Sequence, residues 1–410
     1  MAKIENNPFL TDVFKKTWCK YFSKDKKIYK TSSFNISFVK SKLGLFFYNI
    51  GKNTTNGYQY YYTSNNFSFF KNKTLLLYDL PSYLKNEKLK SKRIKIKKSK
   101  QYPGVFTQLS NYADMEELLQ KNFKAKKRAE LKKFKKRLEL CYDTKYYFYY
   151  NKIEKQVYDE LIVSFFNLLE KRYAQKGIKN RNLSPKFKAY YTELIYKMVN
   201  NNKALFFVLK VNNTPIAMSL SFLSNDTLFY AIPVFDTDFS KFNLGHVSIM
   251  AIFDWCFKNN ISIFDFSKGD GTYKDKWITD NYFFENHIIY DSYNLISILK
   301  AHFLKLFFDF KQFLRNIGMN TKIQKLKFTN KNKINFSTWS IEENKNYNSS
   351  EFEKILNYNL TNPTLNSAIN EYLYKKSIKY SELQIYKHKT LENIYRLFYR
   401  NENIIIKIRN

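Results

Sequence analysis

The sequence has few of the residues that mark several large classes of protein. Its three cysteines are odd in number and widely separated, so we expect a reducing compartment rather than a disulfide framework. Its four histidines lack metal-ligand spacing, so no metal site is predicted. No stretch reaches the roughly 18 uninterrupted apolar residues of a membrane span, and the opening residues lack the apolar core of a signal peptide. We therefore expect a cytoplasmic protein.

The composition is that of a globular chain with an unusual charge. With 410 residues, 44% of them hydrophobic and 19% aromatic, the chain can build two or three domains around a sizeable core. The net charge of +35 favours a polyanionic partner such as nucleic acid, anionic lipid or a phosphate-rich ligand. However, Lys, Asn, Ile, Phe and Tyr are abundant while Gly, Pro and Arg are scarce, a joint bias typical of an AT-rich genome. Part of the charge is therefore background.

Apolar periodicity predicts a mixed α/β fold. The basic run 85–100 is expected to form a solvated loop or an exposed strand edge. Strands are expected at 35–39, 43–50, 58–62, 74–77, 204–211, 215–223, 227–234 and 261–266. Helices are expected at about 11–22, 114–140, 155–176, 186–200, 245–259 and 296–317.

The last of these helices carries an aromatic face flanked by lysines. Such a face can lie on anionic lipid, but packing of the helix on its own domain is the favoured interpretation. Residues 320–410 are rich in Asn, Lys and Tyr, with helix-like pieces at 350–358 and 365–374. We expect an accessory region there and assign it no function.

The most specific stretch is 264–277, Phe-Asp-Phe-Ser-Lys-Gly-Asp-Gly-Thr-Tyr-Lys-Asp-Lys-Trp. It places charges, two glycines and two large aromatic residues directly after an apolar strand. Ligands usually bind at the carboxyl ends of strands in α/β sheets, so this stretch is a candidate site.

At these residues the sequence resembles acetyltransferases of the GNAT superfamily that are associated with cellulose and exopolysaccharide synthesis, also called BioF-like acetyltransferase domains, which are related to FemAB transferases. The resemblance spans about residues 5 to 320. It departs where Lys268 and Lys276 stand in place of the family's usual arginine, and where Gly271 replaces a frequent acidic residue. The matching residues are Asp265, Phe266, Lys268, Gly269, Asp270, Tyr273, Lys274 and Trp277, supported by Asn7-Pro8-Phe9 with Trp18, the basic helix 121–139, Pro215-Ile216-Ala217, Tyr230 and the loop 236–245.

The resemblance implies a GNAT-like acyltransferase fold, with two tandem GNAT-like domains around mixed sheets and a helical C-terminal extension. The domains would be 1–150, a degenerate first copy that carries the basic helix; 151–295, the acyltransferase domain; and 296–410, the accessory region. No internal repeat is visible in the residues, so the duplication is implied by the resemblance alone.

Three residues of the motif are candidates for catalysis. Asp270 could be the general base, or a turn residue that caps the next helix. Tyr273 could protonate the departing thiolate, or pack against Trp277 one helical turn away. Lys274 could hold a phosphate or carboxylate of the acceptor, or be a surface lysine in a lysine-rich chain.

Other residues are candidates for binding. Trp277 could stack on a sugar or an adenine, or lie in the core, and Asp265 is expected to orient the loop. Tyr230, Lys268 and Gly269 complete the expected substrate site. The resemblance implies acyl-CoA, such as acetyl-CoA, as co-substrate, with its pyrophosphate at the single-glycine loop 241–248. Its expected contacts there are Lys241, Gly245 and His246.

These expectations define an N- or O-acyltransferase that acts on an amino or hydroxyl group of a sugar or another precursor of cell-envelope polysaccharide, with peripheral membrane contact. One alternative is a FemAB-like aminoacyl transferase that uses charged tRNA, which the basic helix would suit. Other nucleic acids are not expected as partners. A second alternative is a binding protein on the same fold without activity.

Overall fold

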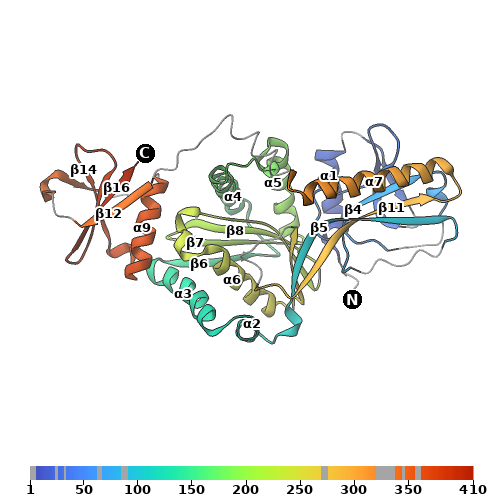
Figure 1. Ribbon diagram of the computed structural model, residues 1–410. Coiled ribbons are helices and arrows are strands. Elements are labelled where there is room, and N and C mark those ends of the chain that lie inside the picture. Colours follow the sequence, from blue (N-terminus) through green and yellow to red (C-terminus); the bar gives the residue numbers. More distant parts are fainter. Residues whose placement is uncertain are drawn as a thin grey trace.

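The computed structural model describes residues 6–23, 26–31, 34–61, 67–84, 91–268, 276–319, 338–343, 347–355 and 362–409. Within these ranges an eleven-stranded mixed sheet extends through most of the molecule, and a second, five-stranded sheet is built from the last 70 or so residues (Figure 1). The mixed α/β class expected from the sequence is confirmed.

The large sheet has the order β1-β2-β3-β4-β11-β5-β10-β9-β8-β7-β6. Most neighbouring strands are antiparallel, and the parallel pairs are β3 with β4 and β9 with β10. The small sheet has the order β12-β16-β15-β14-β13. The strands of the large sheet are β1 (Ile28–Thr31), β2 (Phe34–Lys40), β3 (Phe47–Asn49), β4 (Thr74–Pro81), β5 (Ile94–Gln108), β6 (Thr144–Tyr149), β7 (Ala204–Val211), β8 (Thr214–Leu223), β9 (Thr227–Phe235), β10 (Ile263–Lys268) and β11 (Asp280–Asp291), and those of the small sheet are β12 (Thr338–Glu343), β13 (Phe352–Lys354), β14 (Gln384–His388), β15 (Ile394–Tyr399) and β16 (Glu402–Arg409).

Helices cover both faces of the large sheet and enclose two main cores. One core contains α1, α4 and α5, and the other contains α2, α3 and α6 together with α9 of the C-terminal region. Helix α7 packs on β5, β11 and β4 (Figure 1). Among the described helices, none combines the length and hydropathy that a bilayer span requires. The helices are α1 (Asp12–Phe22), α2 (Met115–Asn122), α3 (Ala125–Cys141), α4 (Lys155–Gln175), α5 (Pro185–Val199), α6 (Leu244–Lys258), α7 (Leu295–Asn316) and α9 (Pro363–Lys376), with short 3-10 turns that include η4 (Arg181–Leu183) and η5 (Thr237–Phe242).

Local sequence signals explain several element boundaries. The Thr11 side chain caps α1 by accepting from the Phe14 amide, and Gly177 follows α4 with φ +61°, a conformation that favours glycine. Asn212 and Asn213 both adopt positive φ in the β7–β8 hairpin, as a tight primed turn requires. The predicted helices near 11–22, 155–176, 186–200, 245–259 and 296–317 are confirmed to within two residues.

Several expectations differ from the structure. Residues 58–61 of the strand expected at 58–62 form no strand, and of the strand expected at 43–50 only 47–49 are strand β3. The single helix expected over 114–140 is two helices, because the chain turns at Phe123, whose ring is buried against Trp277. The second half of the basic run, 94–100, belongs to β5 and pairs with β11 on one side, whereas the described pairs of β10 with β5 cover only residues 104–108. The exposed strand edge, one of the two alternatives expected for this run, therefore agrees with the structure, and Lys95, Lys98 and Lys100 have exposed side chains.

The C-terminal region is also less helical than expected. Among the described residues after 319, α9 is the one helix of several turns, and residues 352–354, expected as helix, form strand β13. The division at residues 150 and 295 stays a prediction. Strand β6, which precedes the expected boundary at residue 150, pairs with β7, which follows it. Strand β11 of the second expected unit lies between β4 and β5 of the first. The large sheet is therefore continuous through both of the first two expected units.

Candidate functional site

The candidate site lies where the parallel strands β9 and β10 separate. Their described pairs run from Thr227 with Ile263 to Phe229 with Asp265 and end there. At this point the register of β10 against β5 shifts, and Ser267 adopts φ +63°. Such an irregularity turns a strand away from its neighbour and redirects its side chains. The carboxyl half of β9 and the end of β10 therefore enclose a space between them.

A cavity of about 530 Å³ occupies this space, a volume within the usual range of ligand sites. Its other sides come from the last turn of α4, from η4 and from the loop before β4. The residues that line it are Asn53, Thr54, Thr55, Asn56, Leu169, Arg172, Tyr173, Lys176, Asn180, Arg181, Asn182, Tyr191, Tyr230, Ala231, Ile232, Pro233, Phe266, Ser267 and Lys268.

The cavity is lined by cationic side chains. Arg172, Lys176, Arg181 and Lys268 line it, and no aspartate or glutamate is among its described lining residues. Burial and the neighbouring Arg172 guanidinium lower the pKa of Lys176. Because a cation crowded by another cation is stabilised when an anion binds between them, this arrangement favours an anionic ligand.

Both arginines are held in place by the surrounding backbone. Arg172 donates from Nη1 to the Pro233 carbonyl oxygen at 2.6 Å, and its guanidinium lies over the Phe235 ring. Arg181 donates from Nη2 to the Asn53 carbonyl oxygen at 2.8 Å. A guanidinium fixed in this way keeps other N–H groups for a phosphate or carboxylate.

The end of β10 is anchored by one ion pair and by several hydrogen bonds. The Lys268 ammonium lies 2.6 Å from a carboxylate oxygen of Asp79, which is buried. Asp265, also fully buried, accepts hydrogen bonds from the hydroxyl groups of Tyr83 and Tyr282 and from the Ser267 amide. Burial first, and the Asp265 charge second, raise the pKa of both tyrosines well above the usual value, so each remains a donor. These contacts fix Asp265 within the strand end, and its expected role of orienting the following loop stays a prediction.

The two aromatic residues predicted to bind substrate, Tyr230 and Trp277, lie in different places: one lines the cavity and the other lies in the core. Tyr230 is almost fully buried, lies against Phe264 with ring centroids 5.2 Å apart, and lines the cavity. Trp277 is fully buried in the core and donates from Nε1 to Nδ1 of His246 at 2.9 Å. Its expected stacking on a sugar or an adenine is incompatible with this position, and core packing, the other interpretation, is what the structure has.

The three residues predicted for the cofactor do not converge in the structure. Lys241, in η5, forms an ion pair of 3.1 Å with Glu371 of α9. His246 is directed into the core, where burial lowers its pKa to about 4, while Gly245 is partly exposed in the first turn of α6. Helix α9 also bonds to η5 through Asn370, whose amide donates to the Asp238 carbonyl oxygen at 3.1 Å. Whether these residues bind a cofactor stays a prediction.

The remaining predicted residues, Gly269, Asp270, Tyr273 and Lys274, lie outside the described residues. The described chain stops at Lys268, which lines the cavity, and resumes at Lys276. Within the described ranges, no group of three His, Cys, Asp or Glu side chains could hold a metal ion.

Sequence reasoning missed the cationic side of the cavity. Arg172, Lys176 and Arg181 lie outside the motif, on a helix end and a short turn that showed only apolar periodicity. One available signal was arginine itself: the chain has nine, against a large excess of lysine, and two of the nine line the cavity. Asp79 could not have been found, because its pairing with Lys268 joins residues 189 positions apart.

Comparison with known proteins agrees with this geometry. Residues 125–275, from the start of α3 to just beyond β10, match the profile of the acetyltransferase (GNAT) domain family. This segment supplies both strands that separate at the cavity, together with α4 and η4. No curated protein matches the chain.

Several solved structures resemble the chain distantly. A protein of unknown function from Bacteroides thetaiotaomicron is 12% identical, with 70% of this chain and 91% of that chain covered and a TM-score of 0.43. FemX is 12% identical, with 62% and 83% covered and a TM-score of 0.44. A tandem GNAT protein from the clavulanic acid biosynthesis pathway is 7% identical, with 62% and 77% covered and a TM-score of 0.31. At these scores the likenesses carry no functional argument.

Proposed function

We propose that the chain is an acyltransferase that moves an acyl group from a thioester, such as acyl-CoA, to an amino or hydroxyl group of an anionic acceptor. The acceptor class that fits best is a phosphate-bearing sugar, such as a sugar nucleotide used to build cell-envelope polysaccharide. The GNAT match over 125–275 supports acyl transfer, and the cavity supports the charge of the acceptor.

One observation carries the proposal. Four cationic side chains from α4, η4 and β10 line a cavity at the point where the two parallel strands separate, with no carboxylate among the described lining residues. Of these, Lys268 is already paired with Asp79, which leaves Arg172, Lys176 and Arg181 as the groups that meet an anion. A phosphate or diphosphate matches the paired guanidinium groups better than a neutral sugar does.

The motif would supply the chemistry. In the proposed step the acceptor nitrogen or oxygen attacks the thioester carbonyl, a C–N or C–O bond forms, and the C–S bond breaks. Asp270 would take the acceptor proton and Tyr273 would protonate the departing thiolate, with Lys274 beside the acceptor anion. Asp270 follows Lys268, which lines the cavity, by two residues in the sequence.

Charged tRNA is the less favoured donor. Most lysines of the basic helix lie exposed on α3, but α3 and α4 belong to the cores on opposite faces of the large sheet. A polynucleotide held by α3 would therefore not extend directly along the cationic side of the cavity. If bulk tRNA bound with a steep salt dependence, and substitution of α3 lysines by glutamate abolished that binding, charged tRNA would be favoured as the donor instead.

The test combines binding and transfer. We expect purified protein to transfer a labelled acyl group from acyl-CoA to an amino-sugar nucleotide, and Asp270→Asn to reduce the rate by at least about a hundredfold while sugar-nucleotide affinity changes little. Lys176→Glu should weaken sugar-nucleotide binding by at least about tenfold. Lys179→Glu is the matched control, because this exposed lysine lies three residues further along the chain and does not line the cavity.

Two results would overturn the proposal. Equal effects of the Lys176 and Lys179 substitutions would show that general surface charge, rather than the cavity, attracts the ligand. Binding of acyl-CoA and sugar nucleotide without transfer to any acceptor would favour a binding protein on this fold.

A further inference from the structure

Helix α7 has two apolar faces, and only one of them is buried. Ala301, Leu304 and Phe308 pack on the sheet with Leu76, Tyr78 and Ile288. The face expected to dock on the domain points instead to solvent. Its residues recur every three or four positions and are 49 to 69% exposed: Leu295, Ile296, Leu299, Phe303, Leu306, Phe307, Phe310 and Phe313, with Ile317 just beyond the helix. A continuous exposed stripe of this size marks an interaction surface.

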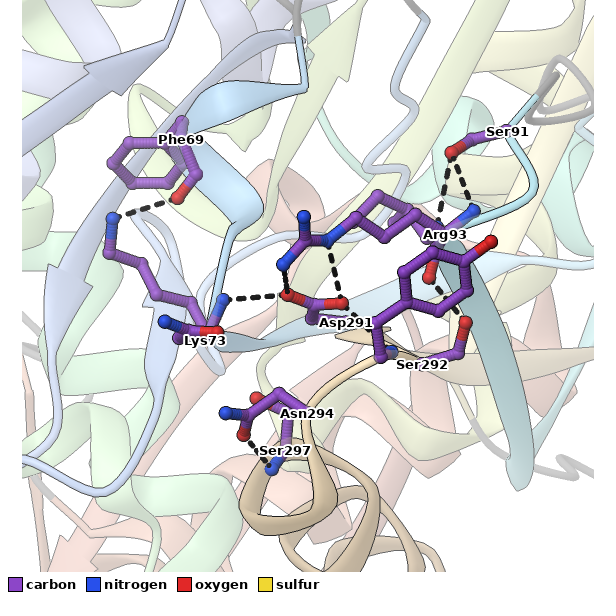
Figure 2. Close-up of polar contacts among 11 residues, drawn as sticks. Phe69, Lys73, Ser91, Arg93, Asp291, Ser292, Asn294 and Ser297 are labelled. Carbon is purple, nitrogen blue, oxygen red and sulfur yellow. Dashed lines mark hydrogen bonds and ion pairs between the residues drawn. The ribbon is translucent and has the colours of Figure 1, made fainter.

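The amino end of α7 is fixed rigidly to the sheet (Figure 2). Arg93, directly before β5, donates from Nε and Nη2 to the two carboxylate oxygens of Asp291, at 2.9 and 2.7 Å. Asp291 also accepts from the amides of Asn72 and Tyr293, and Asn294 caps the helix by accepting from the Ser297 amide at 2.8 Å. These contacts hold the start of α7 in place, so the exposed stripe has a fixed orientation relative to the large sheet.

The carboxyl half of α7 is fixed in the same way. The Asp309 carboxylate accepts from the Ser99 hydroxyl of β5 at 2.6 Å, and the Arg315 guanidinium lies 3.8 Å from the centre of the Tyr102 ring. These contacts hold the polar flank of the helix against β5, with the apolar stripe on the opposite side from Phe308.

Lysines border the stripe along its length. Lys300 and Lys311 lie on one flank of the helix, and the half-buried Lys52 is close enough for Lys311 to help lower its pKa, after burial itself. On the other flank, Lys95 and Lys97 share the face of β5 with Ser99, because alternate residues of a strand point to the same side.

From this arrangement we propose that the exposed face of α7 binds the surface of an anionic lipid bilayer. Aromatic and aliphatic side chains enter the headgroup region while lysines on both flanks contact lipid phosphates, as in helices that lie in the interfacial plane. Charge complementarity selects this occupant over a second copy of the chain, because two copies would bring together molecules of net charge +35. The inference does not depend on the acyltransferase proposal.

Flotation with vesicles tests the proposal on the full chain. We expect the protein to float with vesicles of phosphatidylcholine and phosphatidylglycerol, and to float at least tenfold less with phosphatidylcholine alone. Phe303→Glu combined with Phe310→Glu should reduce binding to the anionic vesicles by at least tenfold, since both side chains are exposed and their loss leaves the core intact. Lys300→Gln combined with Lys311→Gln should reduce binding by roughly fivefold for each lysine removed.

Val163→Glu is the matched control, because Val163 is an equally exposed apolar residue on a different helix, α4. Binding that is unchanged in the double phenylalanine variant, or reduced equally by Val163→Glu, would overturn the proposal. So would sedimentation of the wild-type chain as a dimer that the double phenylalanine variant converts to monomer, since a second copy would then cover the stripe. Failure of the wild-type chain to bind anionic vesicles would overturn it as well.

Discussion

His246 should make the chain lose stability in mild acid. Burial, with a smaller contribution from the Lys127 charge, lowers the pKa of His246 in the folded chain to about 4, against an ordinary 6.5. Its Nδ1 accepts the hydrogen bond from Trp277 Nε1, and a protonated imidazole cannot accept there. Between these two pKa values the unfolded chain binds a proton that the folded chain does not, so stability is complete above pH 6.5 and falls as the pH drops toward 4.

The size of this loss follows from the two pKa values. At pH 8 both states are neutral at this residue, and the contribution is close to zero. At pH 5 the unfolded histidine is almost fully protonated and the folded one is mostly neutral, which lowers the free energy of unfolding by about 2 kcal/mol.

The substitution that isolates the effect is His246→Asn. Its amide oxygen can occupy the position of Nδ1 and accept from Trp277 without titrating. We expect the variant to be destabilised by about 1 kcal/mol at pH 8, and to lose about 2 kcal/mol less than the wild-type chain between pH 8 and pH 5. Burial lowers the pKa of His287 as well, but that residue is present in both proteins and its effect cancels in the comparison.

Urea unfolding followed by circular dichroism at pH 8, 6 and 5 measures the difference. His302→Gln, which changes an exposed histidine on α7, is the control and should keep the wild-type pH dependence. If wild type and His246→Asn lose the same stability on acidification, His246 is not a buried neutral acceptor, and its predicted role in contacting a solvent-borne phosphate regains support.

Three further changes test the structure around the cavity. Gly57→Ala should cost about 1 to 3 kcal/mol in urea unfolding, because the added Cβ would lie 2.1 Å from the buried Phe229 ring of β9; unchanged stability would contradict that close approach. Tyr282→Phe should cost about 1 to 2 kcal/mol by removing a buried hydroxyl that donates to Asp265, and a neutral result would mean that Tyr83 and the Ser267 amide suffice. Arg181→Gln should weaken sugar-nucleotide binding more than Arg315→Gln, since only Arg181 lines the cavity; isothermal titration would show equal losses if location were irrelevant.

Many helices and strands could be predicted from the sequence, because neighbouring residues determine where they begin and end. The β7–β8 hairpin follows from Asn212 and Asn213 between two apolar runs, and α4 ends at Gly177, so nearest neighbours in sequence determined both features. The C-terminal sheet was not predicted, although β15 and β16 carry apolar and aromatic runs, because the region was interpreted from its overall excess of Asn, Lys and Tyr. That residues 104–108 of β5 lie between β10 and β11 could not be predicted, because both partner strands are more than 150 residues away in the sequence.

For the candidate site too, the features set by neighbouring residues could be predicted, and those set by long-range contacts could not. The start of the motif in β10 followed from the apolar strand residues, and Asp265 is a buried hydrogen-bond acceptor in that strand. The cationic side of the cavity could not be predicted, because it forms where α4, η4 and β9 approach one another in three dimensions. The exposed face of α7 is a further example. The sequence revealed an amphipathic helix, but it did not reveal that α7 packs on the sheet through a second apolar face.

Selection of an anionic acceptor by the cavity is the central claim, and initial transfer rates test it most directly. With acyl-CoA held constant, rates would be compared for an amino-sugar nucleotide and the same amino sugar without phosphate, in the wild-type chain, Lys176→Glu and Lys179→Glu. The account predicts a higher kcat/KM for the nucleotide in the wild-type chain and in Lys179→Glu, and a preference reduced at least tenfold in Lys176→Glu. Equal use of the two acceptors by the wild-type chain, or an unchanged preference in Lys176→Glu, would contradict it.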